Sequence, residues 1–318
     1  MTAQVLIVLM LLSGIQSDSG VENAIESYER GKFTEAANSF RKLADSFPSD
    51  PEIRIWLGRS YLKIREWDKA VREMETAVQL KPDSAQYHLW LGRACGSRAS
   101  HTVFFKALGW ARRVVKEFET ARKLAPENLD VRFDLLEYYL EAPGIVGGGR
   151  EKADAEVRSI SKISAEKGYN ARAVVFTKDK KWDLARKELE KAVLDYPRSA
   201  SAHKDLASFL LDRNDLEGAL DYARKALLLD SNSKKARIIE AAAKIRLKLD
   251  LDEEAEILRK FAAGALGDGD PSFEEVYYWL GECFLAKGDR IKARESFVSA
   301  LAYDPEFDKA KDRLSRLR

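Results

Sequence analysis

Small and apolar residues recur along the chain with a period of 34 residues, and this spacing is the main structural signal in the sequence. Pro48 and Pro82 lie one period apart, and each closes a stretch with the same internal order. The matching positions are Leu57-Gly58 with Leu91-Gly92, and Ala36 with Ala70. A fixed period of this length predicts an array of helical hairpins, each of which buries its apolar face against its neighbours.

Each period divides into two amphipathic helices joined by a short turn. Small residues such as Gly58 and Ala70 allow the paired helices to approach closely, and larger residues such as Trp56, Tyr61 and Met74 fill the space between hairpins. A proline after the second helix ends it, because proline lacks an N–H group and disfavours a helical residue before it.

Helix starts carry capping residues. Asp50 followed by Pro51 predicts an N-cap with proline at the first helical position. The pair Ser49 and Glu52 has the spacing of a capping box, and so has the pair Ser272 and Glu275. These signals agree with the helix boundaries that the period predicts.

The pattern resembles the tetratricopeptide repeat family, whose 34-residue unit carries Leu-Gly, Tyr, Ala, an aromatic residue, Ala and Pro at set positions. The best-matching repeat contains Leu57, Gly58, Tyr61, Ala70, Met74, Ala77 and Pro82. The last repeat contains Leu280, Gly281, Phe284, Gly288, Ala293, Phe297, Ala300 and Pro305. The resemblance implies an all-α, right-handed α-solenoid of about eight helical hairpins with a C-terminal capping helix.

In this register a signal peptide is expected over residues 1–19, followed by a single solenoid over residues 20–318. The repeats are expected at residues 17–50, 51–84, 85–128, 129–165, 166–199, 200–233, 234–273 and 274–305. Residues 306–318 are expected to form a polar helix that caps the last repeat.

The resemblance implies a non-catalytic scaffold that binds a peptide or helix of a partner protein, because such arrays place the first helix of each repeat along a concave groove. The expected partner-binding residues are Tyr28, Arg59, Lys63, Arg93, Phe133, Glu137, Lys204, Tyr278 and Glu282. Arg59, Lys63 and Arg93 lie in neighbouring repeats, where they are suited to an acidic segment or a C-terminal carboxylate. The alternative is that these side chains are ordinary solvated charge.

Composition narrows the function classes. The 54 basic residues nearly balance the 52 acidic residues, which argues against a nucleic-acid-binding protein with a concentrated basic excess. The three histidines lack metal-binding spacing, and no nucleophile-elbow motif occurs, so we expect no enzyme, no metal and no cofactor. Cys95 and Cys283 lie in distant repeats near a buried helix position, which favours packing over a disulfide.

The N-terminus contains an uninterrupted apolar run, Val5 to Leu12. A helix of this length spans about 12 Å, which is short of the roughly 30 Å core of a bilayer. The length is typical of the apolar region of a signal peptide and predicts export to the periplasm or cell envelope. No Lys or Arg precedes the run, so two alternatives remain: a first solenoid helix of a cytoplasmic protein, and a membrane-associated anchor.

The period is first interrupted between Pro82 and Pro126, which are 44 residues apart. Residues 101–118 there read as one long helix with basic residues on one side. Its apolar positions, expected to pack on neighbouring helices, are Phe104, Leu108, Ala111, Val115 and Phe118. The alternative is a membrane-surface adaptor that uses the N-terminal apolar run and this helix, with Phe105 and Trp110 exposed beside basic side chains.

The second interruption is a glycine-rich loop over residues 141–151. The N–H groups of Gly147, Gly148 and Gly149, leading into a helix at Arg150, are suited to binding an anion or small ligand. The alternative is a structural loop in which glycines adopt positive φ angles.

Overall fold

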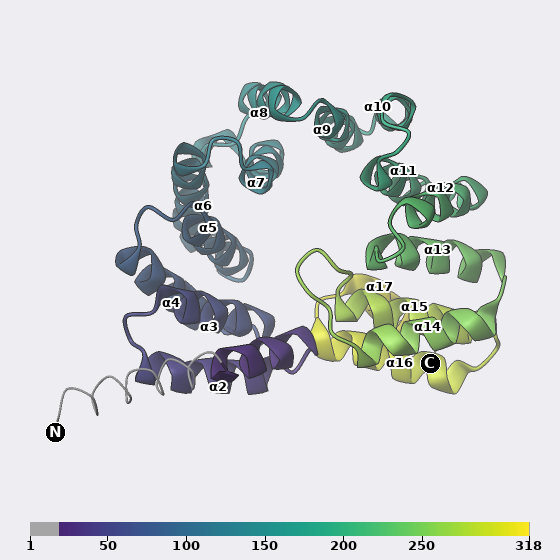
Figure 1. The fold of residues 1–318 in the computed structure, drawn as a ribbon, viewed down its shortest axis with the longest axis horizontal. Coiled ribbons are helices and arrows are strands. Elements are labelled where there is room, and N and C mark those ends of the chain that lie inside the picture. The colour runs from purple at the N-terminus through teal and green to yellow at the C-terminus, as the bar shows by residue number, and fades with distance from the viewer. Residues whose placement is uncertain (1–18, 318) are drawn as a thin grey trace, which may run out of the picture. The chain divides into compact units, whose positions relative to one another are not determined.

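The computed structural model describes residues 19–317, and its regular elements are α-helices and one short 3-10 helix (Figure 1). The predicted all-α solenoid class is therefore confirmed. The helices gather in two compact units, the first ending at Ile163 and the second starting at Ser164. The sequence pattern predicted one array over residues 20–318. An array can divide between any two hairpins, because each repeat depends mainly on its neighbours.

The first unit contains four helical hairpins. A helix over residues 19–29 shares a buried core with α2. The later pairs are α3 with α4, α5 with α6, and α7 with α8, and the short helix η1 lies between α7 and α8. The bounds are α2 (Phe33–Ser46), α3 (Pro51–Lys63), α4 (Trp67–Leu80), α5 (Ala85–Ser100), α6 (Phe104–Leu124), α7 (Leu129–Glu141), η1 (Gly144–Val146) and α8 (Arg150–Ile163).

The second unit contains four further hairpins and a terminal helix. The pairs are α9 with α10, α11 with α12, α13 with α14, and α15 with α16, and α17 packs on α16. The bounds are α9 (Ala165–Lys178), α10 (Trp182–Asp195), α11 (Ala200–Asp212), α12 (Leu216–Leu229), α13 (Lys234–Leu247), α14 (Leu251–Ala263), α15 (Phe273–Ala286), α16 (Arg290–Tyr303) and α17 (Asp308–Arg316).

The short turns of six hairpins that the structure describes each contain a residue with a left-handed backbone conformation. These residues are Gly31, Arg65, Lys180, Asn214, Lys248 and Gly288. The longer α7–α8 connection also contains such a residue, Gly147. The α5–α6 and α7–α8 hairpins use other connections, and both coincide with the interruptions of the sequence period. Inserted residues have therefore replaced the common short turn in two neighbouring hairpins of the first unit.

Each first helix from α3 onward begins with a side chain that accepts a backbone N–H bond. The capping residues are Asp50, Ser84, Asn128, Ser164, Ser199, Ser233 and Ser272. The predicted caps at Asp50 and Ser272 are confirmed, whereas the capping box predicted at Ser49 is wrong. Asp50 takes the N-cap position because Pro51 is the first helical residue.

The glycine of the Leu-Gly pair on α3, α5 and α15 faces a large residue of the second helix. A Cβ atom at Gly58 would lie 2.8 Å from Met74 Cγ, and one at Gly281 would lie 2.5 Å from Phe297 Cε1. A Cβ atom at Gly92 would likewise overlap the buried ring of Phe118. Glycine is needed at these positions because the opposing side chain occupies the space that any other residue would require.

A polar bond also joins the two helices of several hairpins. The fourth residue of α3, α5, α7 and α13 is basic, and each contacts a glutamate of the following helix. The pairs are Arg54–Glu73 at 2.8 Å, His88–Glu117 at 2.7 Å, Arg132–Glu156 at 2.7 Å and Arg237–Glu254 at 2.8 Å. Three of these glutamates are buried, namely Glu117, Glu156 and Glu254. The periodicity of the sequence does not reveal such buried partners, because it reports residue types and not the contacts between helices.

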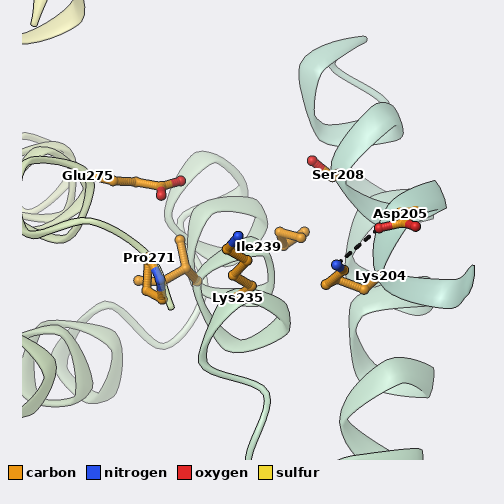
Figure 2. A pocket seen from close by; sticks show the side chains of 8 residues that line it. Lys204, Asp205, Ser208, Lys235, Ile239, Pro271 and Glu275 are labelled. Carbon is orange, nitrogen blue, oxygen red and sulfur yellow. Dashed lines mark ion pairs between the residues drawn. The ribbon is translucent and has the colours of Figure 1, made fainter. Parts of the chain in front are cut away.

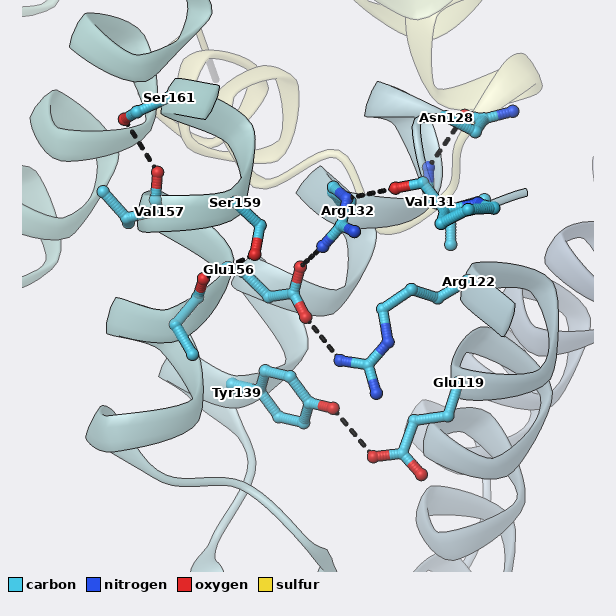
Figure 3. A network of polar contacts seen from close by, with 12 residues as sticks. Glu119, Arg122, Asn128, Val131, Arg132, Tyr139, Glu156, Val157, Ser159 and Ser161 are labelled. Carbon is cyan, nitrogen blue, oxygen red and sulfur yellow. Dashed lines mark hydrogen bonds and ion pairs between the residues drawn. The ribbon is translucent and has the colours of Figure 1, made fainter. Parts of the chain in front are cut away.

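The largest of these contacts holds three helices of the first unit together (Figure 3). Glu156 on α8 accepts from Arg132 on α7 at 2.7 Å and from Arg122 on α6 at 2.5 Å. Beside it, the Tyr139 hydroxyl donates to Glu119 at 2.9 Å. Both carboxylate oxygens of Glu156 are thus paired with guanidinium groups, which offsets the cost of burying the charge.

Two further expectations concern cysteines and membranes. Cys95 and Cys283 are buried free thiols, as the packing interpretation predicts, and burial raises their pKa to about 12 and about 11 respectively. Among the described residues, no helix is long and apolar enough to cross a bilayer. The expected signal peptide lies almost entirely in residues 1–18, outside the described part of the chain.

We expect Gly92→Ala to lower the free energy of unfolding by about 2 kcal/mol, because the new methyl group has no room beside Phe118. Gly109→Ala is the matched control, since both glycines lie in the α5–α6 hairpin. No atom lies within 4 Å of a Cβ atom at Gly109, so its replacement should stabilise α6 by about 0.5–1 kcal/mol. Urea denaturation followed by circular dichroism measures both effects, and equal changes in the two variants would contradict the proposed crowding.

We expect Glu156→Gln to lower the free energy of unfolding by about 3 kcal/mol, because it leaves two guanidinium groups without their buried carboxylate. The control on the same helix is Asp154→Asn, which removes an exposed pair with Arg150 and should cost less than about 0.5 kcal/mol. Urea denaturation of both variants measures the difference. A cost for Glu156→Gln as small as that of the control would show that the buried network contributes little.

Candidate binding surface on the first helices

The predicted partner-binding residues lie on the first helices of their hairpins, but they differ in exposure. Tyr28, Arg59 and Tyr278 are buried. Arg93 and Glu282 are half-buried and form ion pairs within the chain, with Asp134 at 2.7 Å and with Arg313 of α17 at 2.6 Å. The remaining residues that solvent reaches are Lys63, Phe133, Glu137 and Lys204.

Arg59 is part of the packing between hairpins rather than a free surface charge. Its side chain is 4% exposed, and its guanidinium carbon lies 3.8 Å from the ring centroid of Trp56 and 4.5 Å from that of Trp90. Tyr28 of the preceding hairpin lies 5.2 Å away. The expectation that Arg59 offers its charge to a partner is therefore corrected. Aromatic faces attract a desolvated cation, so Arg59 links three successive hairpins.

Tyr278 is also a core residue. Its ring centroid lies 5.2 Å from that of Trp279 and 5.8 Å from that of Phe297, and Phe307 contacts it from the segment before α17. Glu282 lies on the same helix and pairs with Arg313 of α17. The segment that contains α17 thus contacts α15, the first helix of the last hairpin. Tyr278 and Glu282 therefore make their contacts within the chain.

Helix α7 presents three neighbouring acidic residues, Asp134, Glu137 and Glu141, at the predicted surface. Solvent reaches Glu137, yet the surrounding protein, followed by the carboxylates of Asp134 and Glu141, raises the pKa of its carboxyl group. Arg93 opposes this shift, but it already pairs with Asp134. A cationic group brought close to Glu137 would therefore be attracted.

In the second unit, the first helices α11 and α13 and the start of α15 enclose an open cavity of about 300 Å³ (Figure 2). It contains a side chain from the predicted set, Lys204, which pairs with Asp205 at 3.1 Å. The lining residues are Lys204, Asp205, Ser208, Lys235, Ile238, Ile239, Pro271 and Glu275. Two isoleucines and a proline are buried, and the polar side chains surround them, so the cavity combines apolar and charged contacts.

Lys235 and Glu275 are the cavity's most available charges. Lys235 is exposed, and neither side chain forms an ion pair within the described residues. Burial, and to a smaller extent Glu274 and Asp212, raises the pKa of the Glu275 carboxyl group, although Lys309 and Lys235 oppose the shift. A bound group that donates hydrogen bonds to Glu275 would therefore relieve an existing cost.

Sequence reasoning missed most of this cavity, although the signal was present. Ser208, Lys235, Ile238 and Glu275 occupy repeat positions 9, 2, 5 and 2, when each repeat is numbered from residue 200, 234 or 274. They lie on first helices, which the family resemblance places along the groove. Only the structure shows which of them meet around one space.

The glycine-rich loop does not have the geometry expected of an anion site. Gly147, Gly148 and Gly149 donate their N–H groups to the carbonyl oxygens of Gly144, Pro143 and Tyr139. Arg150 pairs with Asp154 at 2.9 Å. Gly147 and Gly149 adopt φ angles of 99° and 155°, so the loop fits the structural alternative. The three N–H groups that the anion hypothesis required are already used.

The long helix α6 packs through most of the expected positions, since Phe118 is buried and Leu108, Ala111 and Val115 are half-buried. Val114, Glu117, Phe118 and Ala121 are buried, whereas Phe104 is exposed. Its first turns extend beyond this buried face. Among the described residues, no group of three or more acidic, histidine or cysteine side chains is suited to holding a metal.

Three family comparisons decide the identity of the repeats. Models described as tetratricopeptide repeat match residues 27–93, 171–235 and 274–307. The chain belongs to the tetratricopeptide repeat family. The matched segments of this tetratricopeptide repeat protein leave residues 94–170 unmatched, and both hairpins with inserted residues end in that range. No curated protein matches the sequence.

Solved structures show the same fold at low sequence identity. The chain is similar to yeast Tom70, with a TM-score of 0.59 and 16% identity over 95% of this chain and 63% of that chain. The human IFIT1 dimer with m7Gppp-AAAA gives 0.51 and 14% identity over 92% and 70%. A tetratricopeptide repeat protein from Parabacteroides merdae gives 0.46 and 11% over 95% and 98%. This chain thus spans less than two thirds of Tom70.

Glu275→Gln should raise the free energy of unfolding at pH 7, because the buried carboxylate is less favourable there than in the unfolded chain. A raised folded pKa means that stability is highest when the group is protonated and falls as pH rises through that pKa. The advantage of the variant should therefore disappear below the ordinary glutamate pKa. Urea denaturation at both pH values tests this, and an advantage that persists in acid would contradict the assignment.

Proposed function

We propose that this chain is a non-catalytic protein-interaction scaffold and that its second unit binds an extended segment of a partner protein. The tetratricopeptide repeat family supports a scaffold in general. The observation that carries the finer proposal is the cavity lined by α11, α13 and the start of α15. It combines apolar contacts with Lys235 and Glu275, which form no ion pair within the described residues.

The cavity's chemistry defines the partner segment. Lys235 suits an acidic side chain of the partner, and Ile238, Ile239 and Pro271 suit an adjacent apolar side chain. Glu275 suits a backbone N–H group or a cationic side chain, since either would stabilise its charged form. The expected ligand is therefore a segment in which an acidic residue neighbours an apolar one.

The helical framework also favours binding. The cavity residues lie on or beside helices that are capped and packed within one unit, so little of the receptor needs to become ordered when a segment binds. Most of the ordering cost then falls on the segment itself. Exposed polar contacts around the cavity would set specificity more than affinity.

We propose an exported, periplasmic or cell-envelope location on the basis of the apolar run Val5 to Leu12. A cytoplasmic or membrane-associated location is the alternative. The near balance of 54 basic and 52 acidic residues supports a protein partner over a nucleic acid. The glycine-rich loop is not proposed as an anion site, because its glycine N–H groups donate to carbonyl oxygens within the chain.

Selection of phage-displayed peptides on the full chain tests whether the cavity binds a partner segment. We expect enriched peptides to place Asp or Glu beside an apolar residue, and to bind less tightly as salt is raised. The double variant Lys204→Glu with Lys235→Glu should weaken the enriched peptides by about tenfold, measured by fluorescence anisotropy.

Lys187→Glu with Arg198→Glu is the charge-matched control, because both residues are exposed in the second unit and lie outside the cavity. The control should retain wild-type affinity. Equal binding by wild type and the cavity variant would rule out the cavity as the binding site. A selection that enriches no peptide above a blank surface would do the same.

A further inference from the structure

The α5–α6 hairpin ends in an exposed apolar tip. Val103, Phe104 and Phe105 are 67%, 70% and 84% exposed, and they are followed by the exposed Lys106. The two phenyl rings contact each other in a T-shaped arrangement with centroids 5.7 Å apart. We call residues 103–106 the hairpin tip. Three consecutive apolar side chains at such exposure leave unfavourable apolar surface in water. A patch of this kind is typical of a site that binds a partner or a membrane.

The hairpin is longer than its neighbours. Its helices contain 16 and 21 residues, whereas α3 and α4 of the preceding hairpin contain 13 and 14. The added length corresponds to the first interruption of the sequence period. The buried face of α6 begins only at Val114, so the inserted residues project the tip rather than enlarge the core.

Contacts to the preceding hairpin hold the base of the tip in place. The His101 ring stacks on Trp67 with centroids 4.5 Å apart. Arg98 pairs with Asp68 at 2.6 Å and donates to the His101 carbonyl oxygen at 3.1 Å. The exposed tip is thus presented from a supported base.

The charge around the tip is strongly one-sided. Residues 84–116 contain six Lys and Arg residues and no Asp or Glu, in a chain that is 33% charged and nearly neutral overall. Arg98 and Arg113 reach back to acidic residues of the preceding hairpin. Lys106, Arg112 and Lys116 are exposed and form no ion pair within the described residues. The hairpin therefore combines an apolar tip with cations that have no counter-charge among residues 19–317.

We propose that the hairpin tip inserts into the interfacial layer of a lipid bilayer that carries anionic headgroups. A bilayer presents a negative layer above a hydrocarbon layer, which matches cations placed behind apolar side chains. The proposed contact is peripheral, because it is made by the exposed side chains of one hairpin. It goes beyond the proposed peptide groove, and it places this hairpin, rather than the N-terminal run, at the lipid surface.

Two other occupants fit part of these observations. A single-stranded nucleic acid would use the cations and stack bases on the phenyl rings. A second copy of the chain would bury the phenyl rings but would bring the unpaired cations of two tips together. The bilayer is favoured because its hydrocarbon layer can bury the phenyl rings while its anionic headgroups pair with the cations. The experiments below also distinguish the two alternatives.

Co-sedimentation of the full chain with vesicles tests the proposal. We expect binding to vesicles of phosphatidylcholine mixed with phosphatidylserine, weaker binding to phosphatidylcholine alone, and loss of binding at high salt. Phe104→Ser with Phe105→Ser should weaken binding by about tenfold. Lys106→Glu with Arg112→Glu should also weaken it, by about fivefold or more for each reversed charge.

Matched controls change the same chemistry elsewhere. Leu194→Ser with Leu228→Ser removes two leucines that are 78% and 86% exposed in the second unit, and Lys187→Glu with Arg198→Glu repeats the charge change there. Both controls should bind like wild type. All the substituted side chains are exposed, so circular dichroism and gel filtration should show that each variant folds like wild type.

Insertion itself can be observed with an environment-sensitive dye. A Phe105→Cys variant labels selectively, because Cys95 and Cys283 are buried. We expect the emission of the dye to shift to the blue when anionic vesicles are added. Equal vesicle binding by wild type and the phenylalanine variant, or no shift, would overturn the proposal. So would binding of a single-stranded oligonucleotide without vesicle binding, or a dimer that the phenylalanine variant separates.

Discussion

Close packing between the paired helices of a hairpin underlies the regular stacking of this fold. At Gly58, Gly92 and Gly281 the first helix has no side chain, and a large residue of the second helix occupies that space. Helices brought this close can share one apolar seam, and the next hairpin then packs on the surface that remains. The N-cap residues and the left-handed turns set where each helix begins and ends, so the same contact recurs along the chain.

Charge has two roles in this fold. Buried glutamates such as Glu156 and Glu254 accept hydrogen bonds from basic residues of the preceding helix, and they join elements that apolar contacts alone would leave less specifically placed. Arg59 behaves similarly, since it is stacked among aromatic rings. The charges left for partners are therefore fewer than the composition suggests. Lys235 and Glu275 in the second unit, and Lys106 and Arg112 in the first, lack ion pairs within the described residues and lie at the two surfaces proposed to bind.

The two inserted segments show that an interruption can serve different purposes. Residues 142–149 form a loop whose glycine N–H groups bond to carbonyl oxygens within the chain. The Tyr138 hydroxyl of α7 lies 2.7 Å from the carbonyl oxygens of Val146 in this loop and of Ala111 in α6, so the loop completes the packing around α6. The insertion at the α5–α6 turn instead leaves Phe104 and Phe105 in solvent. The difference lies in satisfied polar groups and buried apolar area, neither of which is evident from the presence of an insertion alone.

The helical hairpins, their period, the caps at Asp50 and Ser272 and the packing role of Cys95 could be predicted from the amino-acid sequence, because these features depend on local chemistry and regular spacing. The family resemblance also indicated that first helices line the groove, and the cavity residues lie on or beside such helices. The folded structure was needed to show that Arg59 and Tyr278 are buried, that Glu282 pairs with Arg313, and that Lys235 and Glu275 line one cavity. Exposure and pairing depend on neighbouring hairpins about 34 residues or more away in the chain, and a repeating pattern of residue types does not encode which neighbour fills a given space.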